Sequence, residues 1–227
     1  MPFTPFKLFD SLPIEPRLAE IWRRFESLSF VGNQMPENLM LVDFFARRVE
    51  GDIVECGTWK GGMACAMMAA VGPSRDYHFF DSFEGLPPAD GRDGQRALAY
   101  QADTASPNYF DNCRADYEAF HRLVHSQGIP AERIHIHKGW FKDTLPAFPA
   151  DRRISVLRLD GDWYESTMDC LTGLWDRVSP GGIVIVDDYD PWDGCARAVH
   201  DFLSRRGLAS RIYRTPVTYV PYIIKTD

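Results

Sequence analysis

The sequence predicts an α/β fold: a mostly parallel seven-stranded sheet, covered by helices on both faces, with an antiparallel hairpin at its C-terminal end. Short apolar runs alternate with helical segments through the middle of the chain. Those runs are continuously apolar, which is typical of parallel strands buried on both faces. The length of 227 residues suits a single domain of this kind.

The first 50 residues are expected to form an N-terminal helical cover, with residues 51–227 as the core of the domain. Amphipathic helices are predicted at 15–28 and 36–49. In the second of these, apolar side chains recur at helical spacing, at Leu39, Val42, Phe45, Ala46 and Val49. The cover therefore presents an apolar face on which the sheet can pack.

The first half of the core begins with a strand at 52–56, a glycine-rich turn and a helix from 63 to 71. A second strand at 77–80 leads to Asp81. Residues 82–110 contain several prolines, glycines and charges, and we predict a long loop there. Long loops in compact domains are usually lids or mobile segments.

The second half continues the alternation. A helix whose end is set by Pro180-Gly181-Gly182 precedes an apolar strand, because proline and glycine stop helices. The last two strands are close in sequence and read as a hairpin. The expected helices are 111–127, 163–178 and 195–206, and the expected strands are 133–137, 154–159, 183–186, 210–214 and 218–225.

Composition excludes several classes of protein. Apolar residues make up 45% and charged residues 25%, which is ordinary for a globular chain, and the net charge is −7. An acidic chain without a basic run is a poor candidate for binding nucleic acid or an anionic membrane. Five cysteines without CxxC spacing indicate reduced thiols. With no signal peptide and no long apolar stretch in view, a cytoplasmic location is expected.

The turn after the first strand, residues 55–62 (ECGTWKGG), lies between a strand and a helix. Its glycines allow a ligand to approach the backbone, and the helix that follows presents free N–H groups. The spacing matches neither the dinucleotide nor the triphosphate pattern. Glu55 would repel a pyrophosphate but suits the ammonium group of S-adenosylmethionine (SAM). An ordinary strand–helix turn is the alternative.

Asp81 ends the second strand, 26 residues after Glu55. In nucleotide-binding folds, an acid at this place binds the ribose hydroxyls. After a glycine-rich turn, it favours a ligand that contains ribose. The alternative is that Asp81 only caps the turn or the helix beside it.

Two further apolar strands end in acids: Asp160 and Asp162 after one, Asp187 and Asp188 after the other. If these strands are neighbours, Asp160, Asp187 and Asp188 converge at one edge of the sheet. Clustered carboxylates repel one another unless they bind protons or a cation, and three oxygen ligands suit Mg²⁺ or Ca²⁺. Asp162 is then placed to act as a general base. Helix caps are the alternative for these acids.

Five motifs in this order resemble the macrocin O-methyltransferase family over residues 35–225. This family comprises SAM- and Mg²⁺-dependent enzymes that methylate sugar hydroxyls of macrolides and aminocoumarins. The resemblance implies a Rossmann-like class I methyltransferase fold. The motifs are 55–62 (ECGTWKGG), 81–87 (DSFEGLP), 138–146 (KGWFKDTLP), 159–167 (LDGDWYEST) and 181–189 (GGIVIVDDY).

The resemblance also implies a role for each matching position. It gives metal ligation to Asp160, Asp187 and Asp188, and the role of base to Asp162. It implies a small-molecule acceptor with a hydroxyl group and an amino-terminal region that takes part in contacts between subunits of a homo-oligomer. The residues expected around the cofactor are Glu55, Gly57, Thr58, Asp81, Ser82 and Asp160, with Trp140 and Phe141 near the adenine.

Other interpretations stay open at this point. The same acids could serve a phenol or catechol acceptor, because a catechol and a vicinal diol both offer two oxygens to a metal ion. A SAM-binding module without catalysis and an NAD-dependent oxidoreductase are more distant alternatives. Among the remaining residues, Trp192 follows the acids on a loop and is a candidate wall of the acceptor pocket. His135 and His137 are expected to be surface residues.

Overall fold

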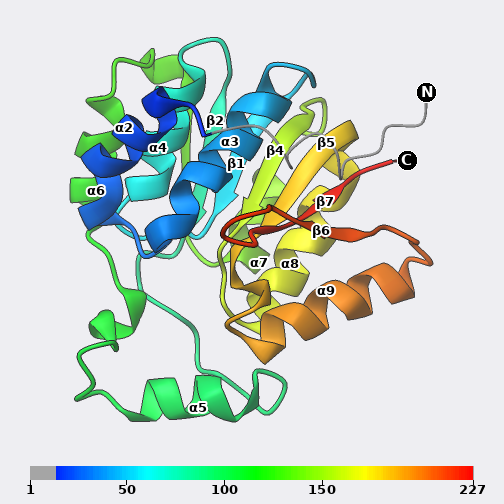
Figure 1. Cartoon of the computed structure of the whole chain (residues 1–227). Coiled ribbons are helices and arrows are strands. Elements are labelled where there is room, and N and C mark those ends of the chain that lie inside the picture. The colour runs from blue at the N-terminus through cyan, green and yellow to red at the C-terminus, as the bar shows by residue number, and fades with distance from the viewer. Residues whose placement is uncertain (1–13, 227) are drawn as a thin grey trace.

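The computed structural model describes residues 14–226, in which seven strands form one sheet (Figure 1). The strand order is β3-β2-β1-β4-β5-β7-β6. Strands β1 to β5 run parallel, whereas β7 is antiparallel to both β5 and β6. The strands are β1 (Asp52–Cys56), β2 (Tyr77–Asp81), β3 (Ile134–Lys138), β4 (Ile154–Leu159), β5 (Val178–Val186), β6 (Ile212–Arg214) and β7 (Pro221–Ile224). The expected sheet and its terminal hairpin are confirmed.

Helices cover both faces of this sheet, as the continuous apolar strands predict (Figure 1). Two apolar cores, one on each face, hold the layers together. One face carries α2 (Pro16–Phe25), α3 (Met35–Ala46), α4 (Gly62–Val71) and α6 (Tyr117–His125). The other carries α7 (Phe141–Thr144), α8 (Tyr164–Leu174) and α9 (Asp193–Arg205).

The expected N-terminal cover is described only from residue 14 onward, and residues 1–13 lie outside the described part of the chain. Both α2 and α3 pack on α4 through buried side chains such as Leu18, Phe25 and Leu39. They share one apolar core with β1 and β4. Within the described range, no helix is both long and apolar enough to cross a lipid bilayer.

The segment predicted as a long loop contains a helix, so that prediction was incomplete. Helix α5 (Gly94–Ala102) lies in it and is set apart from the sheet on two connecting segments (Figure 1). Among its residues only Ala97 is buried. An isolated helix with so little apolar contact leaves almost no hydrophobic pattern in the sequence, which is why the prolines and glycines around it dominated the prediction.

Two expected helices have different bounds from those predicted. Helix α8 stops at Leu174, and Val178 already pairs with Ile154, so that Pro180-Gly181-Gly182 lies inside β5. The register of β4 and β5 shifts there, since the glycines form a bulge. The region 111–127 begins instead with a left-handed turn from Phe110 to Cys113, and α6 starts only at Tyr117.

Candidate active site

The turn between β1 and α4 passes close to the end of β4. Gly57 has a φ of +88°, and a Cβ atom on it would lie 1.7 Å from the backbone oxygen of Asp160. Only glycine therefore fits there. The amide of Asp160 donates to the oxygen of Cys56 at 2.8 Å, which ties the two strand ends together. The cofactor turn and the predicted metal ligands are thus joined by backbone contacts.

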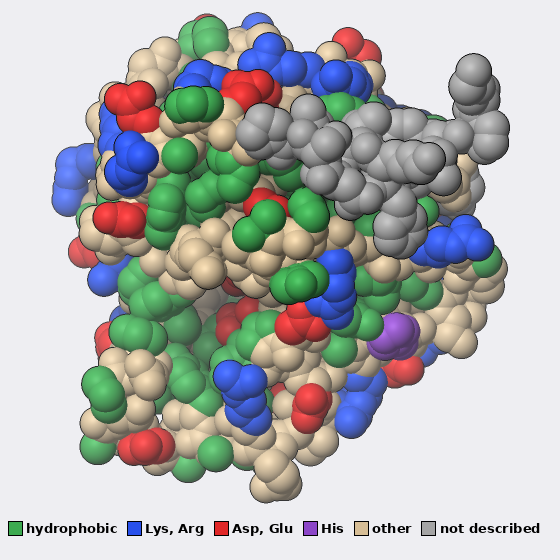
Figure 2. Space-filling model, in the orientation of Figure 1, with side chains coloured by type: hydrophobic (Ala, Val, Ile, Leu, Met, Phe, Trp, Pro, Cys, Tyr) green, Lys and Arg blue, Asp and Glu red, His purple; other side chains and the backbone are tan. Residues whose placement is uncertain are grey.

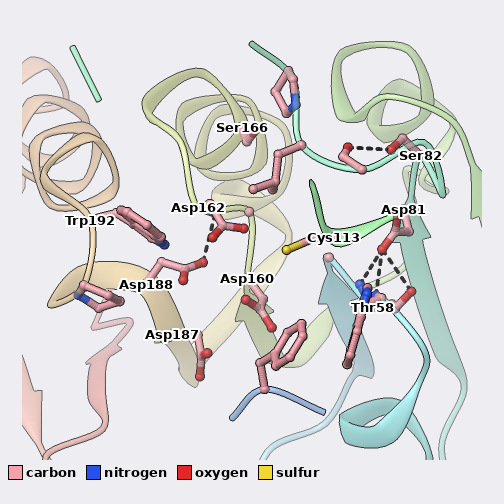
Figure 3. Close-up of a pocket in the computed structure, with 18 of the residues that line it drawn as sticks. Thr58, Asp81, Ser82, Cys113, Asp160, Asp162, Ser166, Asp187, Asp188 and Trp192 are labelled. Atoms are coloured by element: carbon pink, nitrogen blue, oxygen red, sulfur yellow. Dashed lines mark hydrogen bonds between the residues drawn. The ribbon is translucent and has the colours of Figure 1, made fainter. Parts of the chain in front are cut away.

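Asp81 fixes the conformation of that turn. Its Oδ2 accepts from the backbone amides of Thr58 at 2.7 Å and Trp59 at 2.9 Å (Figure 3). Its Oδ1 accepts from the backbone amide of Phe83 at 2.7 Å. Burial raises the pKa of this carboxyl, and the three backbone donors oppose the change. Asp81 thus caps the turn, as the alternative expected, while it also faces the cavity where a ribose would lie.

Glu55 and Arg158 form a buried ion pair beneath the turn. They are direct neighbours on β1 and β4, and both side chains are 0% exposed. Arg158 Nη1 donates to Glu55 Oε1 at 2.9 Å, whereas Glu55 Oε2 has no hydrogen-bond partner. Burial raises the pKa of Glu55 to about 8, although Arg158 opposes this. The free oxygen borders the cavity and can accept from a ligand.

The structure brings Asp160, Asp187 and Asp188 together, as predicted. One oxygen from each lies within 4.8 Å of the others. Asp160 Oδ2 and Asp187 Oδ1 face Arg158, each at 2.7 Å, and Asp188 Oδ2 accepts from the amide of Asp162 at 2.9 Å. Within residues 14–226, the second oxygen of each carboxylate is left without a hydrogen bond, and three hard oxygen donors fit Mg²⁺ or Ca²⁺.

Asp162 projects from the loop after β4 toward these acids (Figure 3). Burial, followed by the charge of Asp160, raises its pKa to about 8. Burial likewise raises the pKa of Asp187, to about 6, and that of Asp188. Burial is the main cause of these shifts, and the neighbouring carboxylates add to them. A cation held among these acids would favour their charged forms.

All predicted site residues line one cavity of about 1140 Å³. It lies at the carboxyl ends of β1, β2, β4 and β5, where ligands bind in open α/β sheets. The space-filling view shows the hollow between the body and the lobe that carries α5, with acidic side chains inside it (Figure 2). Trp140 and Phe141, which are predicted to lie near the adenine, border the cavity together with Ser82.

Trp192 also lines this cavity, on the side of the acids (Figure 3). Its ring meets Trp163 edge-on at 5.0 Å and Tyr100 at 5.7 Å between centroids. These contacts hold the indole in place next to Asp162. A rigid aromatic wall at this position suits an acceptor, as the sequence indicated for Trp192.

Several lining residues were missed by the sequence reasoning. Three aromatic rings from distant segments meet at the cavity: Phe30, Trp59 and Phe110. The centroid of the Phe30 ring lies 3.8 Å from that of Trp59 and 4.1 Å from that of Phe110. No local pattern marks them, because only the fold brings them together. Arg158 did leave a signal: it is an arginine within an otherwise apolar strand, ISVLRL. Such a residue in a buried strand needs a carboxylate partner.

The strand order, the antiparallel β7 and the cavity at the carboxyl ends of the strands define a class I SAM-dependent methyltransferase fold. Solved structures agree. The O-methyltransferase NovP matches with a TM-score of 0.70 and 31% identity, covering 90% of this chain and 80% of that one. The calicheamicin methyltransferase CalS11 matches with a TM-score of 0.68 and 20% identity over 95% of both chains, which supports the fold alone.

The sequence comparisons identify the family. The family model for macrocin O-methyltransferase matches residues 22–222. The 8-demethyl-8-(2,3-dimethoxy-alpha-L-rhamnosyl)-tetracenomycin-C 4'-O-methyltransferase of Streptomyces olivaceus is 37% identical over 219 residues, 90% of this chain and 79% of that protein. The demethyldecarbamoylnovobiocin O-methyltransferase of Streptomyces niveus is 35% identical over 193 residues, 81% and 71% of the two chains. The protein therefore belongs to the macrocin O-methyltransferase family and is an O-methyltransferase.

Proposed function

We propose that the protein transfers a methyl group from SAM to a sugar hydroxyl of a glycosylated natural product, with the help of a divalent cation. The observation that carries this proposal is the convergence of Asp160, Asp187 and Asp188 beside the cofactor turn in one cavity. The relatives support the acceptor class, since one is named for a rhamnosyl-tetracenomycin and another for a novobiocin derivative.

The cofactor would lie across the carboxyl ends of β1 and β2. Glu55 Oε2 is free to accept from its ammonium group, and the turn at Gly57 and Thr58 leaves room for its methionine part. Asp81 and Ser82 would face the ribose. Trp140 and Phe141, at the start of α7, would lie around the adenine. Two proteins of the same fold were solved with SAM or S-adenosylhomocysteine (SAH) bound.

Asp160, Asp187 and Asp188 would hold a divalent cation, which would act as a Lewis acid toward the acceptor hydroxyl. Asp162 lies next to them and would accept the hydroxyl proton. The acceptor oxygen then forms a bond to the methyl carbon while the carbon–sulfur bond breaks. The bonding electron pair stays on sulfur, and SAH is the product. The protein's main contribution is to align oxygen, carbon and sulfur.

The size of the cavity suits two ligands side by side, a cofactor and an acceptor. Its volume of about 1140 Å³ exceeds the range of roughly 300–1000 Å³ that is usual for a single small ligand. This volume supports the binding of a cofactor together with an acceptor.

The test is methyl transfer from isotope-labelled SAM to a panel of rhamnosylated polyketides, aminocoumarin glycosides, free sugars and catechols, followed by mass spectrometry. Methylation of a glycoside on its sugar is expected. Transfer to catechols alone would establish the phenolic alternative instead. Binding of SAH by calorimetry without turnover on any member of the panel would indicate a module without catalysis.

A further inference from the structure

Arg158 is the buried residue at this site whose chemistry the proposed function does not yet use. Its side chain is 0% exposed and points from the middle of the sheet toward the carboxyl ends of β1, β4 and β5. A guanidinium is costly to bury unless carboxylates surround it. The carboxylates around Arg158 therefore indicate which groups it positions.

The guanidinium contacts carboxylates from both halves of the site. Nη1 donates to Glu55 Oε1 at 2.9 Å and to Asp160 Oδ2 at 2.7 Å, and Nη2 lies 2.7 Å from Asp187 Oδ1. Glu55 belongs to the cofactor turn, whereas Asp160 and Asp187 belong to the predicted metal ligands. One planar cation thus fixes the spacing of three carboxylates that come from three neighbouring strands.

The network is incomplete in the direction of the ligands. Arg158 Nη2 and Asp187 Oδ1 pair with each other at 2.7 Å, whereas Arg158 Nε and Glu55 Oε2 are buried without a partner among the described residues. Buried polar atoms in folded proteins usually have partners, so Glu55 Oε2, which borders the cavity, points to a ligand or a water as its partner. Each carboxylate contacts Arg158 through one oxygen and keeps the other for a ligand.

We propose that Arg158 is a positioning residue shared by the cofactor and metal subsites. It holds Glu55 in place for the cofactor ammonium and keeps Asp160 and Asp187 at the spacing that a divalent cation requires. This inference rests on the proposed function, because it needs both ligands to bind. It goes further by making one side chain responsible for the geometry of two binding events.

A lysine cannot replace the guanidinium here. Its single ammonium is a point charge and cannot place two nitrogens on carboxylates of different strands. Loss of the partner that orients a metal ligand commonly weakens metal binding about 10–100-fold. Arg158→Met removes charge and fork together, whereas Arg158→Lys removes only the fork.

The experiment measures two affinities separately in wild type, Arg158→Met and Arg158→Lys. Calorimetry gives the Kd for SAH without metal, and electron paramagnetic resonance of free Mn²⁺ gives the Kd for Mn²⁺ without SAH. Arg152→Met is the matched control, since Arg152 pairs with Asp52 and Asp76 at 3.4 and 3.0 Å at the opposite end of the sheet.

We expect Arg158→Met to weaken Mn²⁺ binding at least about tenfold and SAH binding several-fold, with smaller losses of both in Arg158→Lys and none in Arg152→Met. If Arg158→Met does not fold, the lysine variant alone decides. The inference would be overturned by unchanged affinities or by a loss of affinity for only one of the two probes. Tighter Mn²⁺ binding would also overturn it, because Arg158 would then merely compete with the metal. A wild type that binds neither probe would instead refute the proposed function.

Discussion

At the residue scale, Asp162 combines the features expected of the proposed base. Its φ of +55° is the left-handed conformation, which non-glycine residues rarely adopt and which often marks functional positions. That conformation aims the carboxyl at Asp188, whose Oδ2 accepts from the amide of Asp162 itself. The strained backbone conformation of Asp162 thus directs its side chain into the cavity.

Replacing Asp162 by asparagine should lower kcat by about 10²–10⁴, the usual contribution of a general base. Asparagine tolerates the left-handed conformation, so the loop should keep its shape. The affinities for SAH and Mn²⁺ should therefore stay within a few-fold of wild type in calorimetry. A variant with near-normal kcat would show that another group takes the proton.

Removing a metal ligand should have a different signature. Asp187→Ala should abolish methyl transfer, because one of three oxygen ligands is lost, while SAH binding by calorimetry remains. Asp151→Asn is the control and should leave turnover unchanged, because Asp151 is exposed and lies at the opposite end of β4 from the cluster. Full activity of Asp187→Ala would contradict the assignment of the metal site.

The acids at strand ends could be read from the sequence because a parallel sheet brings its carboxyl ends together. Asp160, Asp187 and Asp188 are each the first or second residue after an apolar run. The sequence could not tell that Asp81 also caps the turn or that Glu55 already has Arg158 as a partner. Those contacts depend on side-chain directions that only the folded sheet sets.

At the element scale, the β1–α4 turn depends on one glycine. Gly57 and Gly72 have similar φ values, +88° and +81°, but an added Cβ would meet the backbone oxygen of Asp160 at 1.7 Å at Gly57 and nothing within 4 Å at Gly72. Gly72 has a ψ of −165°, so Gly72→Ala should cost only the backbone penalty of this glycine-favouring region, about 1–3 kcal/mol. Gly57→Ala should cost more, and it should also weaken SAH binding.

Urea unfolding of both variants measures the two costs, and calorimetry measures the change in SAH affinity. Gly72→Ala serves as the control for backbone conformation alone. Equal destabilisation of the two variants, with SAH binding intact in Gly57→Ala, would show that the turn can move away from β4. In that case the close approach would not be needed for the cofactor.

The edge of the sheet at β2 and β3 should make the fold sensitive to acid. His78 is buried, and no sequence pattern singled it out. Its Nδ1 lies 3.1 Å from Nε2 of His137. Burial, with the neighbouring charges of His78 and His135, lowers the pKa of His137 from 6.5 to about 4. The pKa of His78 is lowered as well, chiefly by burial.

Below pH 6.5 these histidines bind protons in the unfolded chain but stay neutral in the folded protein. Their contribution to the free energy of unfolding is therefore lost as the pH falls from about 6.5 toward 4. His137→Gln should reduce this loss, because glutamine does not titrate. Free energies of unfolding from urea titrations at pH 7 and pH 5 measure the effect. A stability difference between the two pH values that is as large in the variant as in wild type would assign it to other groups.

Strands were easier to predict than the segments between them. Largely apolar runs such as 154–159 predict a buried strand, and the structure gives that strand the same bounds. Helix α5 and the turn at Phe110–Cys113 have few buried side chains. Their conformations depend on local hydrogen bonds, for example that from the amide of Leu86 to the oxygen of Asn112, which no periodicity reveals.

At the scale of the whole molecule, the lobe around α5 is tied to the site through one buried acid. Asp93 accepts from the amide of Tyr164, the first residue of α8, at 2.7 Å and from that of Asp90 at 2.8 Å. Trp163 adds a bond from its Nε1 to the oxygen of Pro87 at 2.9 Å. The loop that carries Asp162 is thus attached to the lobe around α5.

Asp93→Ala should loosen this wall. The acceptor KM should rise several-fold, whereas the affinity for SAH should not change, because the cofactor turn makes no contact with Asp93. Steady-state kinetics and calorimetry separate the two effects, and faster limited proteolysis within 86–113 would accompany them. An unchanged acceptor KM would mean that the lobe does not shape the acceptor site.

The acidic net charge of −7 has its functional part in this cavity. Carboxylates from the ends of three strands gather there around Arg158, and burial raises the pKa values of Glu55, Asp187 and Asp188. SAM and the proposed divalent cation would both bring positive charge to it. The proposed mechanism therefore depends on the cation.

Methyl transfer to a glycoside acceptor by chelator-treated enzyme, followed by titration with Mg²⁺, tests this most directly. We predict that EDTA removes the activity and that added Mg²⁺ restores it fully, with SAH binding largely preserved throughout. Methyl transfer that proceeds at the same rate in EDTA as in Mg²⁺ would contradict the account.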